Sequence, residues 1–327
     1  MFHRTAVLRA GLALFLMSLL VSAPAGQRGA DPNRPSGERV GDSGQIDYEK
    51  GFLYATGQGV IPNDEPNSAK AYLRAKGFAK LDAMRNMLMV VDHVRIDSET
   101  VGSDYEAKSD EIKAEVKGIV RGAHIVSERK TALGNSYIVE VTVASPMYGD
   151  QSVASAFVPE ITHRGQSGEG ASALLPELGR TSLSEPPHIQ LLPPGGSRFE
   201  REPITLPDPN QPVSALIIDT RGQQVERCMS PKILRADGSE LWGSVNVNPE
   251  WLIANGIVSY SHSIAEARKL VRTGNNPLIV RGVGVGGGRF HSDAVVSPED
   301  AELIARYNKH DRFLDRFKVI FVVDAGL

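Results

Sequence analysis

The sequence predicts an α+β protein: a domain with one long helix on a largely antiparallel sheet, followed by a second, α/β domain. Two observations carry this prediction. One long helical stripe lies among strand-like segments in the first half, whereas strand and helix signals alternate in the second. In addition, ten of the 20 prolines lie between Pro159 and Pro212. We therefore expect domains over residues 46–149 and 212–327, joined by a Pro/Gly-rich linker over residues 150–211.

In the first domain, residues 51–57 predict a strand, and Asn67 or Ser68 predicts the N-cap of the long helix. We expect its core face to be the stripe formed by Ala69, Leu73, Gly77, Leu81, Met84, Leu88 and Val91. Smaller residues recur on roughly the opposite side, namely Tyr72, Ala75, Ala79, Ala83 and Val90. This second face predicts contact with a partner, the other domain or a second copy. The alternative is that alanine merely favours helix in water.

Further along, residues 94–100 alternate as in a strand with one wet face, and residues 109–117 predict a short helix that ends at Gly118. A strand should then run from Ile119. A turn at residues 133–135 and a returning strand over residues 137–143 predict a hairpin.

In the second domain, the apolar run 214–219 predicts a strand covered on both faces, and Asp237 with Gly238 predicts a hairpin turn. Capping patterns predict helices that start at Asn248, Ser263 and Ser297. Strands are expected over residues 257–260, 278–283, 293–296 and 318–323.

The N-terminus predicts a cleaved signal peptide over residues 1–25. Arg4 and Arg9 precede an apolar run over residues 10–21, and small residues follow at 23–25. A retained membrane anchor is the alternative, although the apolar run is short for it. Residues 26–45 are rich in Gly, Pro and charge, which predicts a disordered tether. The first cysteine is Cys228, so a lipid anchor at the start of the mature chain is not expected.

The charge balance argues against some classes of partner. The net charge of −3 becomes −5 once Arg4 and Arg9 are removed, so nothing in the total charge draws the mature chain to nucleic acid or to an anionic membrane. Since Cys228 is the only cysteine, no internal disulfide can form. The cores must therefore hold by packing alone.

Residues 282–288 are the segment most similar to a phosphate-binding loop. A strand signal precedes these glycines, but another strand signal, not a helix, follows them. We therefore expect a flexible loop within a strand pair.

Other residues with chemical potential are better explained structurally. His262, His291 and His310 lack metal-helix spacing, and Cys228 beside Arg227 has no histidine nearby in sequence. Ser230 and Ser244 lack a nucleophile-elbow context. Asp110 with Glu111, and Asp293 with Glu299, fit a solvated face and a helix N-terminus. We expect no catalytic, cofactor or metal residues.

Residues 54–62, 79–88, 94–100 and 118–123 give the first half a family resemblance. In this order they form an aromatic-Ala-x-Gly strand, an Ala-rich helix and a later Gly-Ala strand. The region 51–144 resembles the twenty-kilodalton-lipoprotein-like exported bacterial domains, related to the N-terminal domain of flagellar assembly protein T. The second half is similar to a domain that follows this one in some exported proteins, through residues 214–222 and 229–234.

The resemblance implies a non-enzymatic protein of the bacterial envelope or flagellum. We expect a periplasmic or outer-membrane-associated binding or assembly module whose partners are envelope or flagellar proteins, with a homo-oligomer through the long helix as an option. The alternative is a periplasmic enzyme or small-ligand binder that uses the second domain and its glycine loop.

Overall fold

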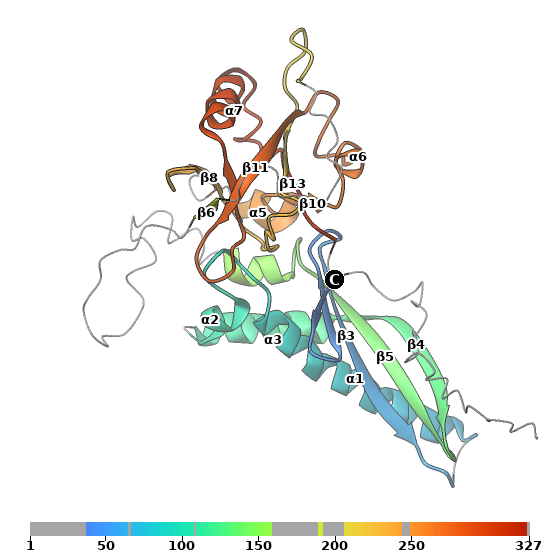
Figure 1. Cartoon of the computed structure of the whole chain (residues 1–327). Helices are drawn as coiled ribbons and strands as arrows, with labels where there is room; N and C mark the ends of the chain where they lie inside the picture. Colours follow the sequence, from blue (N-terminus) through green and yellow to red (C-terminus); the bar gives the residue numbers. More distant parts are fainter. Residues whose placement is uncertain are drawn as a thin grey trace, which may run out of the picture. The chain divides into compact units, whose positions relative to one another are not determined.

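The computed structural model describes residues 37–64, 67–107, 109–158, 189–191, 206–243 and 249–325. These residues form two β-sheets with their helices, which confirms the α+β class (Figure 1). The predicted signal peptide, the tether up to residue 36 and most of the linker lie outside the described residues. None of the described helices combines the length and the hydropathy needed to cross a membrane.

The first sheet is antiparallel throughout, with strand order β1-β2-β3-β5-β4. Its strands are β1 (Glu38–Val40), β2 (Gly44–Asp47), β3 (Phe52–Ile61), β4 (His124–Leu133) and β5 (Ser136–Pro146). The predicted hairpin between β4 and β5 is confirmed, and Gly134 supplies the positive φ of its turn. We expected a tether up to Gln45, but β1 and β2 form a hairpin there.

Helix α1 (Ala69–Asp92) begins at the predicted N-cap, where the Ser68 side chain accepts a hydrogen bond from the Ala71 amide. The predicted core face was wrong over most of its length. Its Leu73 and Leu81 are exposed, and the small-residue side faces the sheet; of the predicted stripe, Val91 is buried, and Met84 and Leu88 are partly buried. The buried side chains of α1 are Ala71, Ala75, Ala79, Ala83, Met87, Val90 and Val91.

Glycines in β3 explain this inversion. A Cβ atom on Gly57 or Gly59 would overlap the backbone of α1 at Ala79 and Ala75, so helix and strand lie in backbone contact. Only alanine-sized side chains fit at such a distance, and leucines must point away. The expected contact of the small-residue face with a partner is thereby replaced by contact with the protein's own sheet.

Two further predictions in this half need correction. Residues 94–100 form no strand, because the Asp97 carboxylate accepts hydrogen bonds from the Glu99 and Thr100 amides and closes a turn. Arg95, expected on a wet face, is buried. After α2 (Gly102–Glu106), helix α3 (Asp110–Gly122) continues past Gly118, where a Cβ would meet open space, so β4 starts later than predicted.

The predicted linker also differs at its beginning. Residues 153–158 are helical, and the side chains of Val153, Phe157 and Val158 are fully buried. Apolar burial of this extent offsets the cost of ordering the segment. This part of the chain therefore belongs to the core of the first half.

The second sheet is mixed, with strand order β10-β13-β7-β11-β12-β8-β9 and β6 (Gln190–Leu191) beside β11. Its remaining strands are β7 (Leu216–Asp219), β8 (Ile233–Arg235), β9 (Glu240–Trp242), β10 (Ser259–Ser261), β11 (Leu278–Gly286), β12 (Asp293–Val296) and β13 (Val319–Val322). Strands β10, β13, β7 and β11 are parallel. Every residue of β7 is buried, as predicted for a strand covered on both faces.

The helices of this half start where the capping patterns predict. Helix α5 (Pro249–Asn255) opens with proline; Asn248 itself is outside the described residues. Before α6 (Ile264–Ala267) and α7 (Pro298–Asp311), the Ser263 and Ser297 hydroxyls accept from the amides of Glu266 and Asp300. The β8–β9 hairpin at Gly238 is confirmed as well.

Residues 35–327 form one compact unit. One cluster of buried apolar side chains extends through both halves, from Ile46 to Val323, and a smaller one covers the other face of β7. We use "first half" for the described residues 37–158 and "second half" for 206–325. The two halves therefore share a continuous core.

Candidate binding surfaces

The carboxyl ends of the parallel strands are the usual ligand-binding edge of an α/β sheet. Charged residues follow these strand ends here. The Arg221 guanidinium donates two hydrogen bonds, of 2.8 and 2.9 Å, to the carboxylate of Asp219, which is the last residue of β7. After β13, the Asp324 carboxylate accepts from the Gly222 amide. These charges are thus satisfied within the protein.

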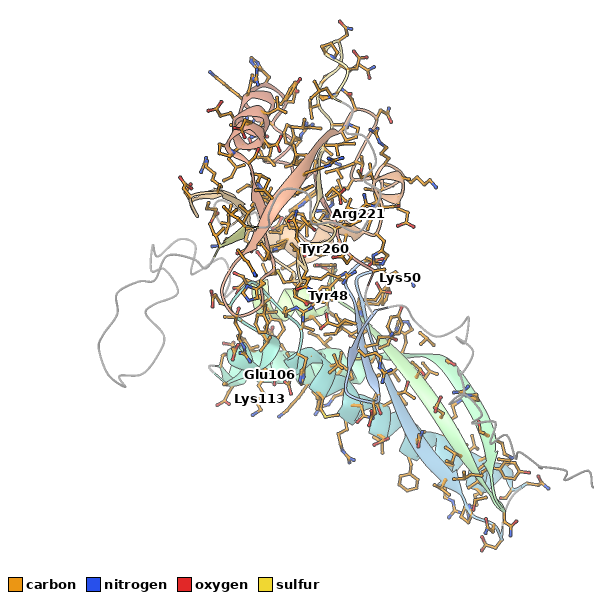
Figure 2. All side chains as sticks on the ribbon, viewed as in Figure 1. Tyr48, Lys50, Glu106, Lys113, Arg221 and Tyr260 are labelled. Atoms are coloured by element: carbon orange, nitrogen blue, oxygen red, sulfur yellow. The ribbon has the colours of Figure 1, made fainter. Side chains whose placement is uncertain are left out.

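The first half fills much of this edge. Glu49, in the turn after β2, places its Oε1 atom 2.8 Å from His262 Nε2 and 3.5 Å from Arg227 Nη2. Next to it, the ring of Tyr48 contacts the ring of Tyr260 edge-on, with centroids 6.3 Å apart; Figure 2 labels both. A ligand at this edge would have to displace protein side chains.

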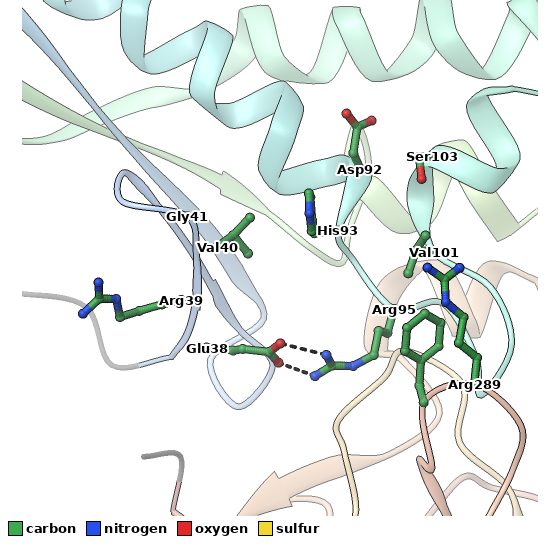
Figure 3. Close-up of a pocket in the computed structure, with 11 residues that line it drawn as sticks. Glu38, Arg39, Val40, Gly41, Asp92, His93, Arg95, Val101, Ser103 and Arg289 are labelled. Atoms are coloured by element: carbon green, nitrogen blue, oxygen red, sulfur yellow. Dashed lines mark hydrogen bonds and ion pairs between the residues drawn. The ribbon is translucent and has the colours of Figure 1, made fainter.

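Arg95 is the central polar residue of the contact between the halves. Its guanidinium forms a bidentate ion pair with Glu38 and donates a hydrogen bond of 2.7 Å to the carbonyl of Arg227 (Figure 3 shows the pair). It also lies 5.7 Å from the centre of the Tyr48 ring. Backbone bonds run alongside, because the Met229 and Ser230 amides donate to the carbonyls of residues 95 and 96. A buried charge satisfied in this way fixes how the halves meet.

The glycine segment does not form a phosphate cradle. Residues 282–286 belong to β11, which pairs with β12 through a short connection, so the predicted strand pair is confirmed and no helix follows the glycines. Gly287 and Gly288 pack against the first half, where a Cβ would meet the side chains of Ser98 and Glu99. The Phe290 amide also donates to the Ser98 carbonyl. The glycines thus allow a close approach between the halves.

Cys228 lies at the same contact and is fully buried. Its backbone amide and carbonyl both bond to the Tyr260 hydroxyl, and burial raises the pKa of its thiol. A nucleophilic cysteine needs a lowered pKa and access to substrate. The structure therefore gives Cys228 a packing role.

The three histidines do not meet. His262 bonds Glu49, whereas His291 and His310 are exposed, on the β11–β12 connection and on α7. The described residues contain no group of three or more side chains that could hold a metal ion.

The remaining serine and acidic candidates from the sequence do not come together at one site among the described residues. The Ser230 amide bonds the first half, and Ser244 is outside the described residues. Asp110 and Glu111 lie in the first turn of α3, and Glu299 in that of α7. Asp293 does not lie on a solvated face or at a helix N-terminus, as we expected. It is buried and accepts a hydrogen bond from the Lys232 amide.

A pocket of about 300 Å³ opens beside Arg95, between the β1–β2 hairpin, the end of α1 and the β11–β12 connection (Figure 3). Arg289 lies at its rim, 4.8 Å from the centre of the Phe290 ring and 3.9 Å from the Asp104 carboxylate. The sequence patterns predicted no ligand-binding role for any residue of this pocket. The lining residues are Glu38, Arg39, Val40, Gly41, Asp92, His93, Arg95, Val101, Ser103, Arg289 and Phe290.

Two open surfaces lie on the first half. Strand β4 is exposed at all ten positions, and among the described strands it pairs only with β5. Helix α1 turns several large apolar side chains away from the sheet. Sequence patterns predicted both elements. The edge position of β4 follows from the order of strands in the sheet, which cannot be predicted from local sequence periodicity.

The fold defines an α+β protein with well-packed apolar cores, whose first half exposes an edge strand and one apolar side of a helix. A family model described as Treponema pallidum Tp0624, second domain, matches residues 215–325, almost the whole second half. This part of the chain is therefore similar to a bacterial domain family. No curated protein matches the chain.

Proposed function

We propose that this chain is a non-catalytic, exported binding or assembly protein of the bacterial cell envelope. The observation that carries the proposal is the edge position of β4, which among the described strands pairs only with β5. A long strand at the edge of a sheet presents unpaired backbone N–H and C=O groups, to which a strand of a partner protein can add. The other edge strand of this sheet, β1, has three residues, against ten in β4. We therefore place the partner on β4.

Charges on β4 support a selective partner. Glu128, Arg129 and Lys130 stand in its centre. Glu128 pairs with Lys76 of α1 at 2.6 Å, and Arg129 pairs with Glu140 of β5 at 2.7 Å. Charged side chains on an edge strand oppose unspecific pairing between identical chains. A partner strand with complementary charges would overcome this barrier.

The place in the cell is part of the proposal. It is supported by the signal-peptide pattern of residues 1–25 and by the resemblance of the first half to lipoprotein-like exported domains and to the N-terminal domain of flagellar assembly protein T. We place the protein in the periplasm or at the outer membrane, with envelope or flagellar proteins as partners.

Adjacent proline substitutions test the role of β4. Successive N–H groups of a strand point to opposite edges, so one of Thr131→Pro and Ala132→Pro removes a bond to β5 and the other removes only an outward donor. Melting curves identify the variant that keeps its fold. We expect this variant to lose the partner that the wild-type chain recovers from the envelope fraction. If the folded variant recovers as much of the partner as the wild-type chain does, the proposal is contradicted.

A small-ligand role is the second candidate, favoured by the pocket beside Arg289 and Phe290. A ligand that binds only the folded state raises its stability. A thermal-shift screen of the full chain against nucleotides, metals and cell-wall fragments tests this role. A shift that disappears in Arg289→Gln would support it, whereas a flat screen would remove it.

A further inference from the structure

The outer side of α1 is apolar where a solvated helix is normally polar. Leu73 and Phe78 are each 65% exposed, Leu81 62% and Met89 51%, although the opposite side of the helix carries mainly alanines in contact with the sheet. Exposed apolar sets of this kind mark surfaces that bind something. The close approach of β3 explains the alanines of the inner side at Ala75, Ala79 and Ala83, but it does not explain why four large apolar residues occur on the outer side.

The same helix is basic. Over its full length, Ala69–Asp92, it contains five basic residues and two acids, Asp82 and Asp92, in a chain whose net charge is −3. The basic residues are Lys70, Arg74, Lys76, Lys80 and Arg85. Lys76 is paired with Glu128, and Arg85 lies 3.8 Å from Asp82, so the positive charge of the surface rests on Lys70 and Lys80. The total charge of the chain therefore hides a local positive surface.

We infer that this outer face of α1, formed by Lys70, Leu73, Phe78, Lys80, Leu81, Arg85 and Met89, docks on the surface of an anionic lipid bilayer. In that geometry the helix lies parallel to the membrane. Its apolar side chains enter the boundary between headgroups and acyl chains, and its basic groups reach the lipid phosphates. This goes beyond the proposed function, because β4 and the outer face are different surfaces with different ligands.

The dimensions of the face favour an extended surface over a pocket. Leu73 and Met89 are sixteen residues apart, which corresponds to about 24 Å along a helix axis. Between them, Gly77 leaves open space where a Cβ would stand. In Figure 1 α1 lies along β3 and β5, and no other described element crosses its outer side over the N-terminal half. A bilayer surface can contact such a row over its whole length.

Charge complementarity separates the lipid from the other occupants. A second copy of this chain would bring two positive helices together, so like charges would repel. Anionic phospholipids supply the opposite charge and an apolar phase at the same boundary. An acidic protein could also supply opposite charge, and the experiment below distinguishes it from lipid.

Vesicle flotation of the full chain tests the inference. We expect binding to phosphatidylcholine vesicles that contain phosphatidylglycerol, at least tenfold stronger than to phosphatidylcholine alone, and weaker at high salt. Lys70→Gln with Arg85→Gln should weaken binding about 25-fold, at about fivefold for each basic residue. Lys269→Gln with Arg306→Gln, two exposed positions of the second half, is the matched control and should change nothing.

A second pair of variants tests the apolar side chains. Phe78→Ser with Leu81→Ser should abolish flotation, whereas Val271→Ser, at a 97% exposed position, should not affect it. Every comparison uses variants of the same full chain, so a contribution of residues 1–25 is common to all, and melting curves verify the fold.

Several results would overturn the inference. These are equal binding to neutral and anionic vesicles, no binding to either, or equal losses in variants and controls. Self-association that depends on Phe78 would assign the face to a second copy instead. Capture of an acidic protein without vesicle binding would assign it to that protein. Strand addition at β4 is measured separately, so its failure is distinguishable from failure here.

Discussion

Gly59 of β3 lies directly against the backbone carbonyl of Ala75 of α1. A Cβ atom on Gly59 would stand 2.8 Å from the carbonyl carbon of Ala75 and closer still to its oxygen. Gly57 has the same relation to Ala79 one turn further along the helix. This contact decides which side of α1 is buried, and it leaves Leu73 and Leu81 exposed.

Substitution of Gly59 tests the contact. Gly59→Ala forces helix and strand apart, and we expect the free energy of unfolding to fall by about 3 kcal/mol. Gly77→Ala is the control, because a Cβ there meets nothing within 4 Å and alanine favours helix; the free energy of unfolding should rise by about 0.5–1 kcal/mol. Urea unfolding measures both. Similar effects of the two substitutions would show that the contact is loose.

Charge insertion on the two sides of α1 should have opposite outcomes. Ala79 is fully buried, so Ala79→Arg should cost a few kcal/mol or prevent folding. Leu81 is 62% exposed, so Leu81→Arg should change the free energy of unfolding by less than about 0.5 kcal/mol. Thermal melting of the two variants compares them. If the Ala79→Arg protein is as stable as the wild type, the buried side of α1 is instead the one predicted from Leu73 and Leu81.

This helix shows what sequence patterns can and cannot predict. Capping residues and 3.6-residue spacing located α1 and its N-cap at Ser68 because these signals are local. The buried side was predicted wrongly because hydrophobicity ranks leucine above alanine. The decisive constraint is Gly57 and Gly59, residues in another element that lie close to the helix only in the fold. Gly77, by contrast, does not mark a contact.

The second half was more predictable, because its caps and apolar strands are local signals as well. The contact between the halves was not, since it depends on Tyr48, Glu49 and Arg95, which are distant in sequence from their partners. The one sequence signal for this contact was Arg95 between the apolar residues Val94 and Ile96. We interpreted it as the solvated face of an alternating strand. The Asp97 turn that removes this strand is a side-chain effect of a single residue.

Separate expression of the halves tests their shared core. Residues 37–158 and 206–325, produced as two chains, should copurify because Arg95, Tyr48 and the backbone bonds at residues 95–98 hold them together. Arg95→Met leaves the Arg227 carbonyl without this donor and should weaken the complex by about 2–4 kcal/mol. Titration by calorimetry measures the affinity. Two folded pieces without affinity would favour independent domains.

Asp293 should make stability depend on pH. Burial raises the pKa of its carboxyl to about 6, above the unfolded value of about 3.9. Between these values the folded state holds a proton that the unfolded state has lost, so stability falls as pH rises from about 4 to 6 and is level above. The loss is about 3 kcal/mol and should be absent in Asp293→Asn. Urea unfolding at pH 4, 5, 6 and 7 compares the two proteins; parallel curves would refute this role.

The most direct test of the proposed function is site-specific photo-crosslinking in intact cells. A photoreactive residue at Ser127, on the exposed strand β4, should give a discrete adduct with an envelope or flagellar protein. The same residue at Arg306, on the exposed side of α7, should give none. Adducts from both positions, or from neither, would contradict the claim that this protein works by binding a partner at the edge of its first sheet.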